Sequence, residues 1–320
     1  MKRDRIVFGI LLVVFVAILA ILPLGIKKDS TINLLVLIFL FVVLASGWNI
    51  LGGFTGQTNL GYAAFFGLGS LATRFLWIMG WPFIPSFLAG GVVAVVFALL
   101  IGAPAFKLRG AYFAIGTLAL AQILNVTVGN VLPEMSYNPD LSNYQLVPRY
   151  YLFLGLAVLT VVTAYLIFHS KVGLGMMAVK EEEDAAESLG VSALKHKLLA
   201  LGISACFAGL AGGAFAYYHV SYYYNFPFSP LWTFDTVTMV FVGGTGTILG
   251  PIIGAIFFVL LKEYLVLNIG EYHLIVFGVL FILVVLFLPG GLVEVWNKIQ
   301  RIFPRFWRAR KSMLPNKKKD

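Results

Sequence analysis

INLLVLIFLFVVLASGWNILGGF, residues 32–54, decides the fold, because none of its side chains carries a charge. An α-helix rises about 1.5 Å per residue, so this run is long enough to cross the roughly 30 Å hydrocarbon core of a bilayer. Further apolar runs lie at about 6–26, 60–79, 83–106, 111–132, 151–168, 198–218, 234–249, 251–265 and 272–288. The sequence therefore predicts an all-α, polytopic integral membrane protein with about ten transmembrane segments.

The composition supports this fold class and excludes a soluble protein. Of the 320 residues, 60% are hydrophobic and 12% are charged, whereas about 25% of an ordinary soluble domain is charged. No soluble catalytic domain fits beside the apolar runs, so we expect one membrane domain over 1–292 and a basic cytoplasmic tail over 293–320. The net charge of +9 and the aromatic residues of the tail favour contact with membrane lipid rather than with nucleic acid. Cys206 is the single cysteine, which excludes an intrachain disulfide.

Lysine and arginine indicate the orientation, since they concentrate in the cytoplasmic segments of membrane proteins. Most of them lie before the first run, between the fourth and fifth, between the sixth and seventh, and after the tenth. Only Lys27, Lys28, Arg149 and Lys262 fall in segments on the other side. We therefore expect both termini to be cytoplasmic. The first run is longer than the core of a signal peptide and lacks a small-residue cleavage motif, so we expect it to remain as a helix.

Two glycine- and threonine-rich stretches interrupt the apolar runs, at 52–59 and 243–251. Non-helical backbone at membrane depth is tolerated where it is buried in protein or lines a watery cavity, and paired breaks in two halves of a chain are typical of transport sites. The candidate pathway residues are Gly53, Thr55, Gly56, Gln57, Asn59, Gly243, Gly244, Thr245, Gly246 and Thr247. Close helix packing through small residues is the alternative. The eighth and ninth runs are short, so broken or re-entrant helices are an alternative to full spans there.

The longest charged stretch between apolar runs is KEEEDAAESLG at 180–190, within a predicted cytoplasmic loop over 169–197. These residues favour a short helix. Ala185, Ala186 and Leu189 are spaced so that we expect them on one face of it, with acidic residues around them. Such a surface suits a partner protein that grips the loop and moves the adjoining membrane helices. A solvated connector is the alternative interpretation.

At this loop the sequence resembles the membrane subunits of ATP-binding-cassette importers, whose cytoplasmic loop carries a Glu-Ala-Ala…Gly signature. The match is DAAESLG at 184–190, with Asp184 in place of the glutamate. More narrowly, the chain resembles the branched-chain amino acid permeases of the M type. That resemblance is carried by the stretches 53–57, 61–67, 108–115, 197–200, 208–212, 243–247, 254–255 and 289–292.

The resemblance implies a permease subunit that imports branched-chain amino acids by alternating access in a bacterial or archaeal cytoplasmic (inner) membrane. It implies three kinds of partner: two ATP-binding subunits, a paralogous permease subunit and an extracytoplasmic solute-binding protein. ATP and Mg²⁺ would be bound by the ATPase, and this chain would hold no cofactor. The residues expected to couple to the ATPase are Glu183, Asp184, Ala185, Ala186, Glu187, Leu189 and Gly190. The external stretch 133–142 departs from the family pattern, which leaves urea and amides as alternative solutes.

No motif for covalent chemistry accompanies these features. The sequence contains neither the Gly-x-x-x-x-Gly-Lys-Ser/Thr phosphate loop nor a Gly-x-Ser-x-Gly elbow, and its histidines lack the spacing of a helical zinc site. We therefore expect a transport subunit without catalytic or metal-binding residues.

Two charged residues, Arg74 and Asp235, fall within apolar runs, where a charge is costly. They are candidates for the outer mouth of a pathway. Alternatively, both lie near helix ends, where Arg74 reaches water and Asp235 caps a helix. The rival to an ATP-driven permease is a self-sufficient secondary transporter coupled to protons or sodium, and a channel or structural subunit is a third alternative. Few acidic residues lie within the runs, which disfavours ion coupling.

Overall fold

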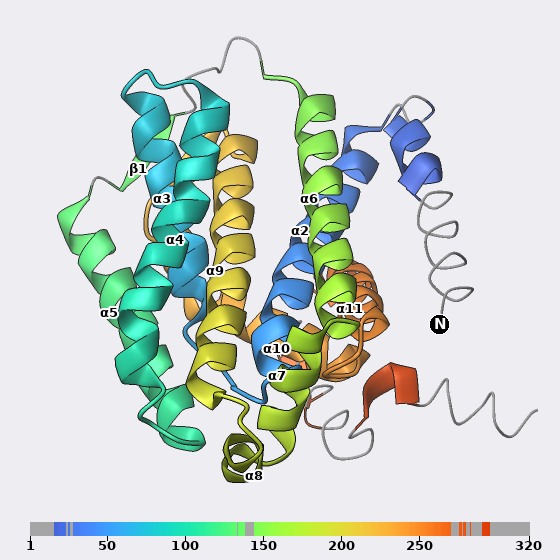
Figure 1. Cartoon of the computed structure of the whole chain (residues 1–320). Helices are drawn as coiled ribbons and strands as arrows, with labels where there is room; N and C mark the ends of the chain where they lie inside the picture. Colours follow the sequence, from blue (N-terminus) through green and yellow to red (C-terminus); the bar gives the residue numbers. More distant parts are fainter. Residues whose placement is uncertain are drawn as a thin grey trace, which may run out of the picture.

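Most of the described residues lie in α-helices, as Figure 1 shows. The computed structural model describes residues 16–23, 25, 28–132, 134–137, 144–269, 275–276, 278–279, 282 and 290–294. The helices are α2 (Asp29–Gly52), α3 (Tyr62–Ile78), α4 (Phe83–Ala105), α5 (Ala111–Val131), α6 (Leu146–Phe168), α7 (Lys171–Glu181), α8 (Glu183–Ser188), α9 (Ala193–Tyr218), α10 (Pro230–Gly243) and α11 (Leu249–Ile269). Two strands, β1 (Met135–Tyr137) and β2 (Ser221–Tyr223), and a 3₁₀ turn, η2 (Phe226–Phe228), are the remaining elements. The predicted all-α class is correct apart from this small sheet.

Six of the described helices are long and apolar enough to cross a membrane: α2, α4, α5, α6, α9 and α11. Two others are shorter, since α3 has 17 residues and α10 has 14. At 1.5 Å per residue α10 is about 21 Å long, less than the thickness of a bilayer core. The first and tenth predicted runs lie largely outside the described residues, so a total of ten spans and two cytoplasmic termini stay predictions.

Helix boundaries differ from the predicted runs where glycine or polar residues intervene. The predicted run over 234–249 is wrong at both ends, because α10 begins at Pro230 and ends at Gly243. Beyond it, Gly244 and Gly246 have φ of +125° and +75°, a region that L-residues with a side chain avoid, so the helix cannot continue. α9 begins at Ala193 and α6 at Leu146, because these helices also include flanking charged residues that the apolar pattern omits.

α2 is the central helix of the described bundle. Its residues from Ile38 to Leu51 are all buried, and α6, α9, α10 and α11 pack around it. Beside it, α3, α4 and α9 approach one another closely through glycine. A methyl group added at Gly69 would collide with the backbone of Gly209, and one added at Gly209 would collide with the side chain of Ala94. The packing role expected of small residues is confirmed at Gly209.

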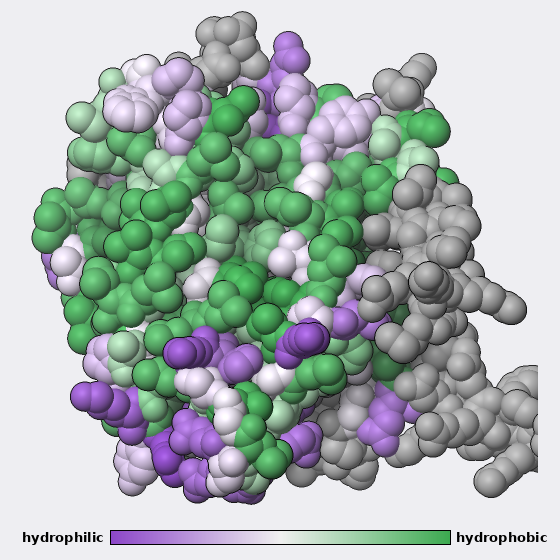
Figure 2. All heavy atoms as spheres, viewed as in Figure 1, coloured by the Kyte–Doolittle hydropathy of each residue, from purple (hydrophilic) through white to green (hydrophobic). Residues whose placement is uncertain are grey.

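The two ends of the bundle differ in structure. α7 and α8 project from one end, called here the α8 end, while β1 and β2 lie at the other, called the β end (Figure 1). β1 and β2 pair antiparallel, with Met135 opposite Tyr223. Figure 2 shows a broad apolar band around the middle of the visible face, with hydrophilic residues gathered below it over α7 and α8. This distribution fits a bundle whose two ends lie in water and whose middle lies in lipid.

Candidate functional site

The charged stretch 180–190 forms the end of α7 and the short helix α8. The backbone is extended at Glu182, with φ of −156° and ψ of 111°, so the single short helix expected here is divided in two. Gly190 has φ of +84° and turns the chain from α8 toward α9. This is the left-handed conformation that glycine adopts readily at helix ends.

α8 and its C-cap residue, Leu189, present two apolar side chains to the outside and one to the inside. Ala185 and Leu189 are exposed, Leu189 by 86%, and their spacing of four residues places them on one face. Ala186 is only 3% exposed and packs with Val179 and Ala193. The expectation that all three share one face is therefore wrong, because adjacent helical residues point about 100° apart. We call the exposed pair the α8 ridge, while Ala186 anchors the helix.

Two ion pairs connect α8 to other segments at this end. Lys197 of α9 is buried, and its Nζ lies 2.6 Å from Glu183 Oε2. Arg109, in the turn between α4 and α5, lies 3.9 Å from Asp184, and both side chains are about three-quarters exposed. The buried pair holds α8 against α9, whereas the exposed pair contributes little to stability.

The two glycine-rich breaks meet at the α8 end. The buried side chain of Asn49, near the end of α2 and just before the first break, bonds to the second: Asn49 Nδ2 donates to the carbonyl oxygen of Thr247 at 2.8 Å, and the Gly246 N–H donates to Asn49 Oδ1 at 2.9 Å. One amide thus satisfies a donor and an acceptor in the second break. A methyl group added at Gly246 would lie 3.1 Å from the carbonyl oxygen of Gly53, so the first break lies directly beside the second.

Lys180 of α7 lies against both breaks. A methyl group added at Gly56 would lie 3.1 Å from Lys180 Cγ, and one added at Gly246 would lie 3.1 Å from Lys180 Nζ. Both glycines have positive φ. The charged loop and the two breaks, which are far apart in the sequence, therefore form one continuous structure.

The other candidate pathway residues are also at this end, and several are enclosed. Thr55 is fully buried and its hydroxyl donates to the carbonyl oxygen of Leu51 at 2.7 Å. Asn59 is also buried and accepts hydrogen bonds from Trp48 and from the Gly61 N–H. Gly243 packs closely against Gly250. Gln57, Thr245 and Thr247 are half-buried, and Gly244 is buried. A direct role of these residues in solute passage stays a prediction.

Arg74 lies at the β end and is completely enclosed, with no exposed surface. Its guanidinium donates to Ser136 Oγ and to the carbonyl oxygens of Ser136, Ala216 and Val220, at 3.1 to 3.4 Å. The alternative that Arg74 reaches water from a helix end is wrong, because backbone carbonyls and the rings of Trp77 and Tyr222 surround it. The side chain fastens β1 and the turn after α9 to α3.

Asp235 lies within α10 and forms an ion pair with Lys262 of α11, whose Nζ is 2.8 Å from Asp235 Oδ2. The pair lines a hollow of about 250 Å³. This hollow shares Leu37, Phe226, Trp232 and Glu263 with a second cavity of about 450 Å³. We call the larger one the β-end cavity, because it lies between the start of α2 and the end of α9. Its polar lining residues are Ser30, Asn33, Tyr218, His219 and Glu263.

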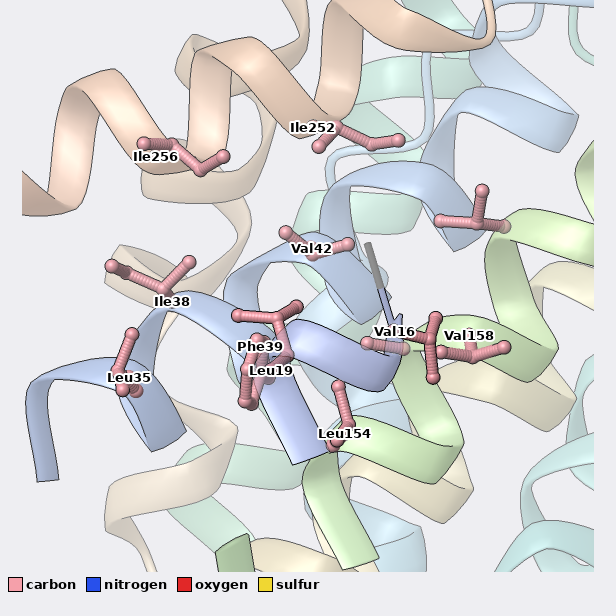
Figure 3. A pocket seen from close by; sticks show the side chains of 12 residues that line it. Val16, Leu19, Leu35, Ile38, Phe39, Val42, Leu154, Val158, Ile252 and Ile256 are labelled. Carbon is pink, nitrogen blue, oxygen red and sulfur yellow. The ribbon is translucent and has the colours of Figure 1, made fainter. Parts of the chain in front are cut away.

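A third cavity has a different chemical character. It has a volume of about 230 Å³ and lies among α2, α6, α11 and the helical segment that contains Val16 and Leu19. Figure 3 shows aliphatic side chains and one phenylalanine pointing into it, without any polar group. A cavity of this composition has no means of orienting a zwitterionic solute.

Sequence reasoning missed several residues that organise these sites. Asn49 was not singled out, although it is a polar residue in an otherwise apolar run. Lys180 and Lys197 lie in stretches that were singled out from the sequence and served there as orientation signals, but neither was given a partner. Lys197 is nevertheless buried and paired, and this partnership spans the turn between α8 and α9.

Comparisons with known proteins agree with these features. A family profile described as "Branched-chain amino acid transport system / permease component" matches residues 30–285. The high-affinity branched-chain amino acid transport system permease protein LivM of Escherichia coli (strain K12) is 26% identical over 309 residues, which cover 83% of this chain and 70% of that protein. The protein of the same name from Salmonella typhimurium is 26% identical over 316 residues, which cover 85% of this chain and 72% of that protein.

A more distant relative is archaeal. The probable branched-chain amino acid transport permease protein LivM of Methanocaldococcus jannaschii is 25% identical over 229 residues, covering 64% of this chain and 65% of that protein. No solved structure gives a significant match. The profile covers most of the chain, and the apolar helices fit a multi-pass membrane protein. The chain therefore belongs to the family of permease components of branched-chain amino acid transport systems.

Proposed function

We propose that this chain is the membrane-spanning permease subunit of an ATP-binding-cassette importer in a bacterial or archaeal cytoplasmic membrane. It moves branched-chain or related amino acids by alternating access, and a separate ATPase supplies the energy. The observation that carries the proposal is the α8 ridge: two exposed apolar side chains on a helix that is itself fastened to α7 and α9.

The α8 ridge is suited to contact a partner protein. Leu189 exposes most of its side chain at an end of the molecule that is rich in charge, and burying a leucine in a partner groove contributes about 1.5–3 kcal/mol. The surrounding Glu181, Glu182, Asp184 and Glu187 are exposed, so a groove with a basic rim is the complementary surface. The proposed contact between the α8 ridge and the ATPase is small, and its role would be to transmit movement from the ATPase to the membrane helices.

A continuous set of contacts leads from this ridge into the membrane domain. α8 is fixed to α9 by Ala186 and by the Glu183–Lys197 pair, and α7 reaches both breaks through Lys180. Asn49 joins the breaks to α2, the central helix. Displacement of α8 by a partner would therefore act on α9 and, through the breaks, on α2, α10 and α11. Rigid elements in contact are the ordinary means by which such displacement is transmitted.

The proposed assembly contains partners on each side. Two ATP-binding subunits would contact the α8 end and bind ATP with Mg²⁺. A paralogous permease subunit would complete the pathway, and an extracytoplasmic solute-binding protein would dock at the β end. The exposed Tyr137 and Tyr223 of the small sheet support this last assignment, since exposed tyrosines are frequent in protein interfaces.

The test is co-purification in mild detergent from cells that produce the full-length chain and its natural partners. Leu189→Asp and Ala185→Asp should each abolish recovery of the ATP-binding subunits, because a carboxylate in an apolar groove is costly. Tyr137→Asp, at the opposite end, is the matched control and should leave their recovery unchanged. Normal recovery with Leu189→Asp would contradict the coupling role. Uphill uptake by the purified chain alone, driven by an ion gradient, would instead favour the secondary-transporter rival.

A further inference from the structure

The β-end cavity combines an apolar wall with a few polar groups. Leu34, Leu37 and Phe215 are among its apolar lining residues, and Asn33 and Glu263 are among its polar ones. Its volume of about 450 Å³ lies in the range of about 300–1,000 Å³ that is usual for small-molecule sites. Two rings of the wall are held by packing, because Trp232 and Phe215 contact each other at a centroid distance of 5.2 Å and both contact Phe66, at 5.0 and 5.3 Å. An amphipathic small molecule fits this lining better than a strongly polar one.

Glu263 is the carboxylate that lines the cavity, and its charge is the one that a ligand could pair with. Asp235 and Lys262 neutralise each other in the adjoining hollow. Burial lowers the pKa of the His219 imidazole to about 4, with the charge of Arg74 as the second cause, so this histidine is neutral at physiological pH. Glu263 lines both hollows and forms no salt bridge with another described residue. A negative charge beside an apolar wall favours a ligand that carries an ammonium group.

Asn33 supplies a donor on another side of the same cavity. The Tyr218 hydroxyl donates to Asn33 Oδ1 at 2.8 Å, which fixes the orientation of the amide. The Asn33 Nδ2 group is thereby left as the donor end, and its N–H bonds suit a carboxylate. The cavity thus offers a group for each charged end of a zwitterion and an aliphatic surface between them.

We propose that the β-end cavity binds the transported amino acid itself, with its ammonium group at Glu263, its carboxylate at Asn33 and its aliphatic side chain along Leu34, Leu37 and Phe215. This inference rests on the proposed function and specifies where the membrane subunit contacts its solute. Selectivity for amino acids over urea or amides follows, because a small neutral solute leaves both the carboxylate and the apolar wall without a complementary group.

The experiment measures binding by calorimetry to the full-length chain in lipid nanodiscs at neutral pH, with three probes. L-leucine carries both charged groups, isopentylamine lacks the carboxylate and 4-methylpentanoate lacks the ammonium. Glu263→Gln should weaken leucine and isopentylamine by at least about tenfold and change 4-methylpentanoate by less than about threefold. Asn33→Leu should show the reciprocal pattern. Glu263→Asp, which keeps the charge, should retain the preference for the amine.

Glu134→Gln is the matched control, because Glu134 is exposed beside β1 and is not among the residues that line the cavity. This variant should bind all three probes with the affinities of the unchanged chain. The proposal is overturned if Glu263→Gln weakens all three probes equally, if it weakens none, or if the unchanged chain binds none of them. Two further outcomes distinguish failure of the proposed function from failure of the proposed binding site. Selective binding without any co-purifying ATPase would overturn that function alone, whereas ATP-driven leucine uptake at an unchanged rate and KM with Glu263→Gln would overturn the site alone.

Discussion

At the two ends of the bundle, different kinds of side chain provide hydrogen-bond partners for backbone groups outside the helices. At the α8 end, a neutral amide, Asn49, pairs with the break at Gly246 and Thr247, and glycines allow the segments to touch. At the β end, the buried cation Arg74 donates to three backbone carbonyls and stacks with aromatic rings. Loss of a partner from a buried, charged guanidinium costs more than loss of a partner from a neutral amide. We infer that the β end is the more rigidly held of the two.

The largest expected effect is at the β end. Arg74→Met removes all the guanidinium donors and leaves the buried carbonyls that they contact unpaired, so it should lower the free energy of unfolding by about 3–5 kcal/mol. Denaturant titration in mixed micelles, followed by near-ultraviolet circular dichroism, measures this change. Arg74→Lys should recover little of the loss, because an ammonium cannot reproduce the planar fork of donors. Full recovery with lysine would show that only the charge matters there.

A smaller loss is expected at the α8 end. Asn49→Leu leaves the Gly246 N–H and the Thr247 carbonyl unpaired and should cost about 2–3 kcal/mol in the same titration. Asn268→Leu is the control, because the side chain of Asn268 is exposed and donates to the Tyr264 carbonyl oxygen within α11 itself. That substitution should change stability by less than about 0.5 kcal/mol. Equal effects of the two substitutions would remove Asn49 from its joining role.

Gly246→Ala tests the contact between the two breaks. The added methyl group would meet the Gly53 carbonyl and Lys180 Nζ at a φ of +75°, so a loss of about 1–2 kcal/mol is expected. Gly155→Ala, in α6, meets nothing within 4 Å and should be neutral or slightly stabilising. If Gly246→Ala is also neutral, the breaks are looser than the structure indicates.

The smallest effect is expected at the exposed ion pair of the α8 end. Arg109→Ser removes the contact with Asp184, in which both side chains are largely exposed, and should change stability by less than about 0.5 kcal/mol. Lys197→Met is the comparison, because it leaves Glu183 without its buried partner and should be clearly more destabilising. A large effect of Arg109→Ser would mean that the turn between α4 and α5 is part of the anchor of α8.

Long apolar runs were predictable because lipid imposes a minimum helix length. The run over 32–54 was predicted within three residues of α2 at either end, since only charges and glycines limit it. The break between α10 and α11 falls within the predicted glycine- and threonine-rich stretch 243–251, but the apolar run was carried too far into it, because the helix end depends on positive φ at Gly244 and not on hydrophobicity.

Side-chain direction was harder to predict than helix position. α8 has six residues, too few for hydrophobic periodicity to show that Ala186 faces inward. The partners of Arg74 are backbone carbonyls far away in the sequence, such as that of Ala216, and no residue pattern marks a carbonyl. The cavity at Glu263 likewise requires α2, α9 and α11 to be packed together before it exists.

Because Ala186 points inward, the residue that fixes α8 to α7 and α9 is distinct from the outward-facing residues of the α8 ridge, although all of them lie within about one helical turn. A larger residue at position 186 would push α8 away from α7 and α9, whereas the side chains at positions 185 and 189 point outward and can change without disturbing this packing. If the proposed function holds, adapting this chain to a different ATPase would therefore require changes at positions 185 and 189, with Ala186 kept as it is.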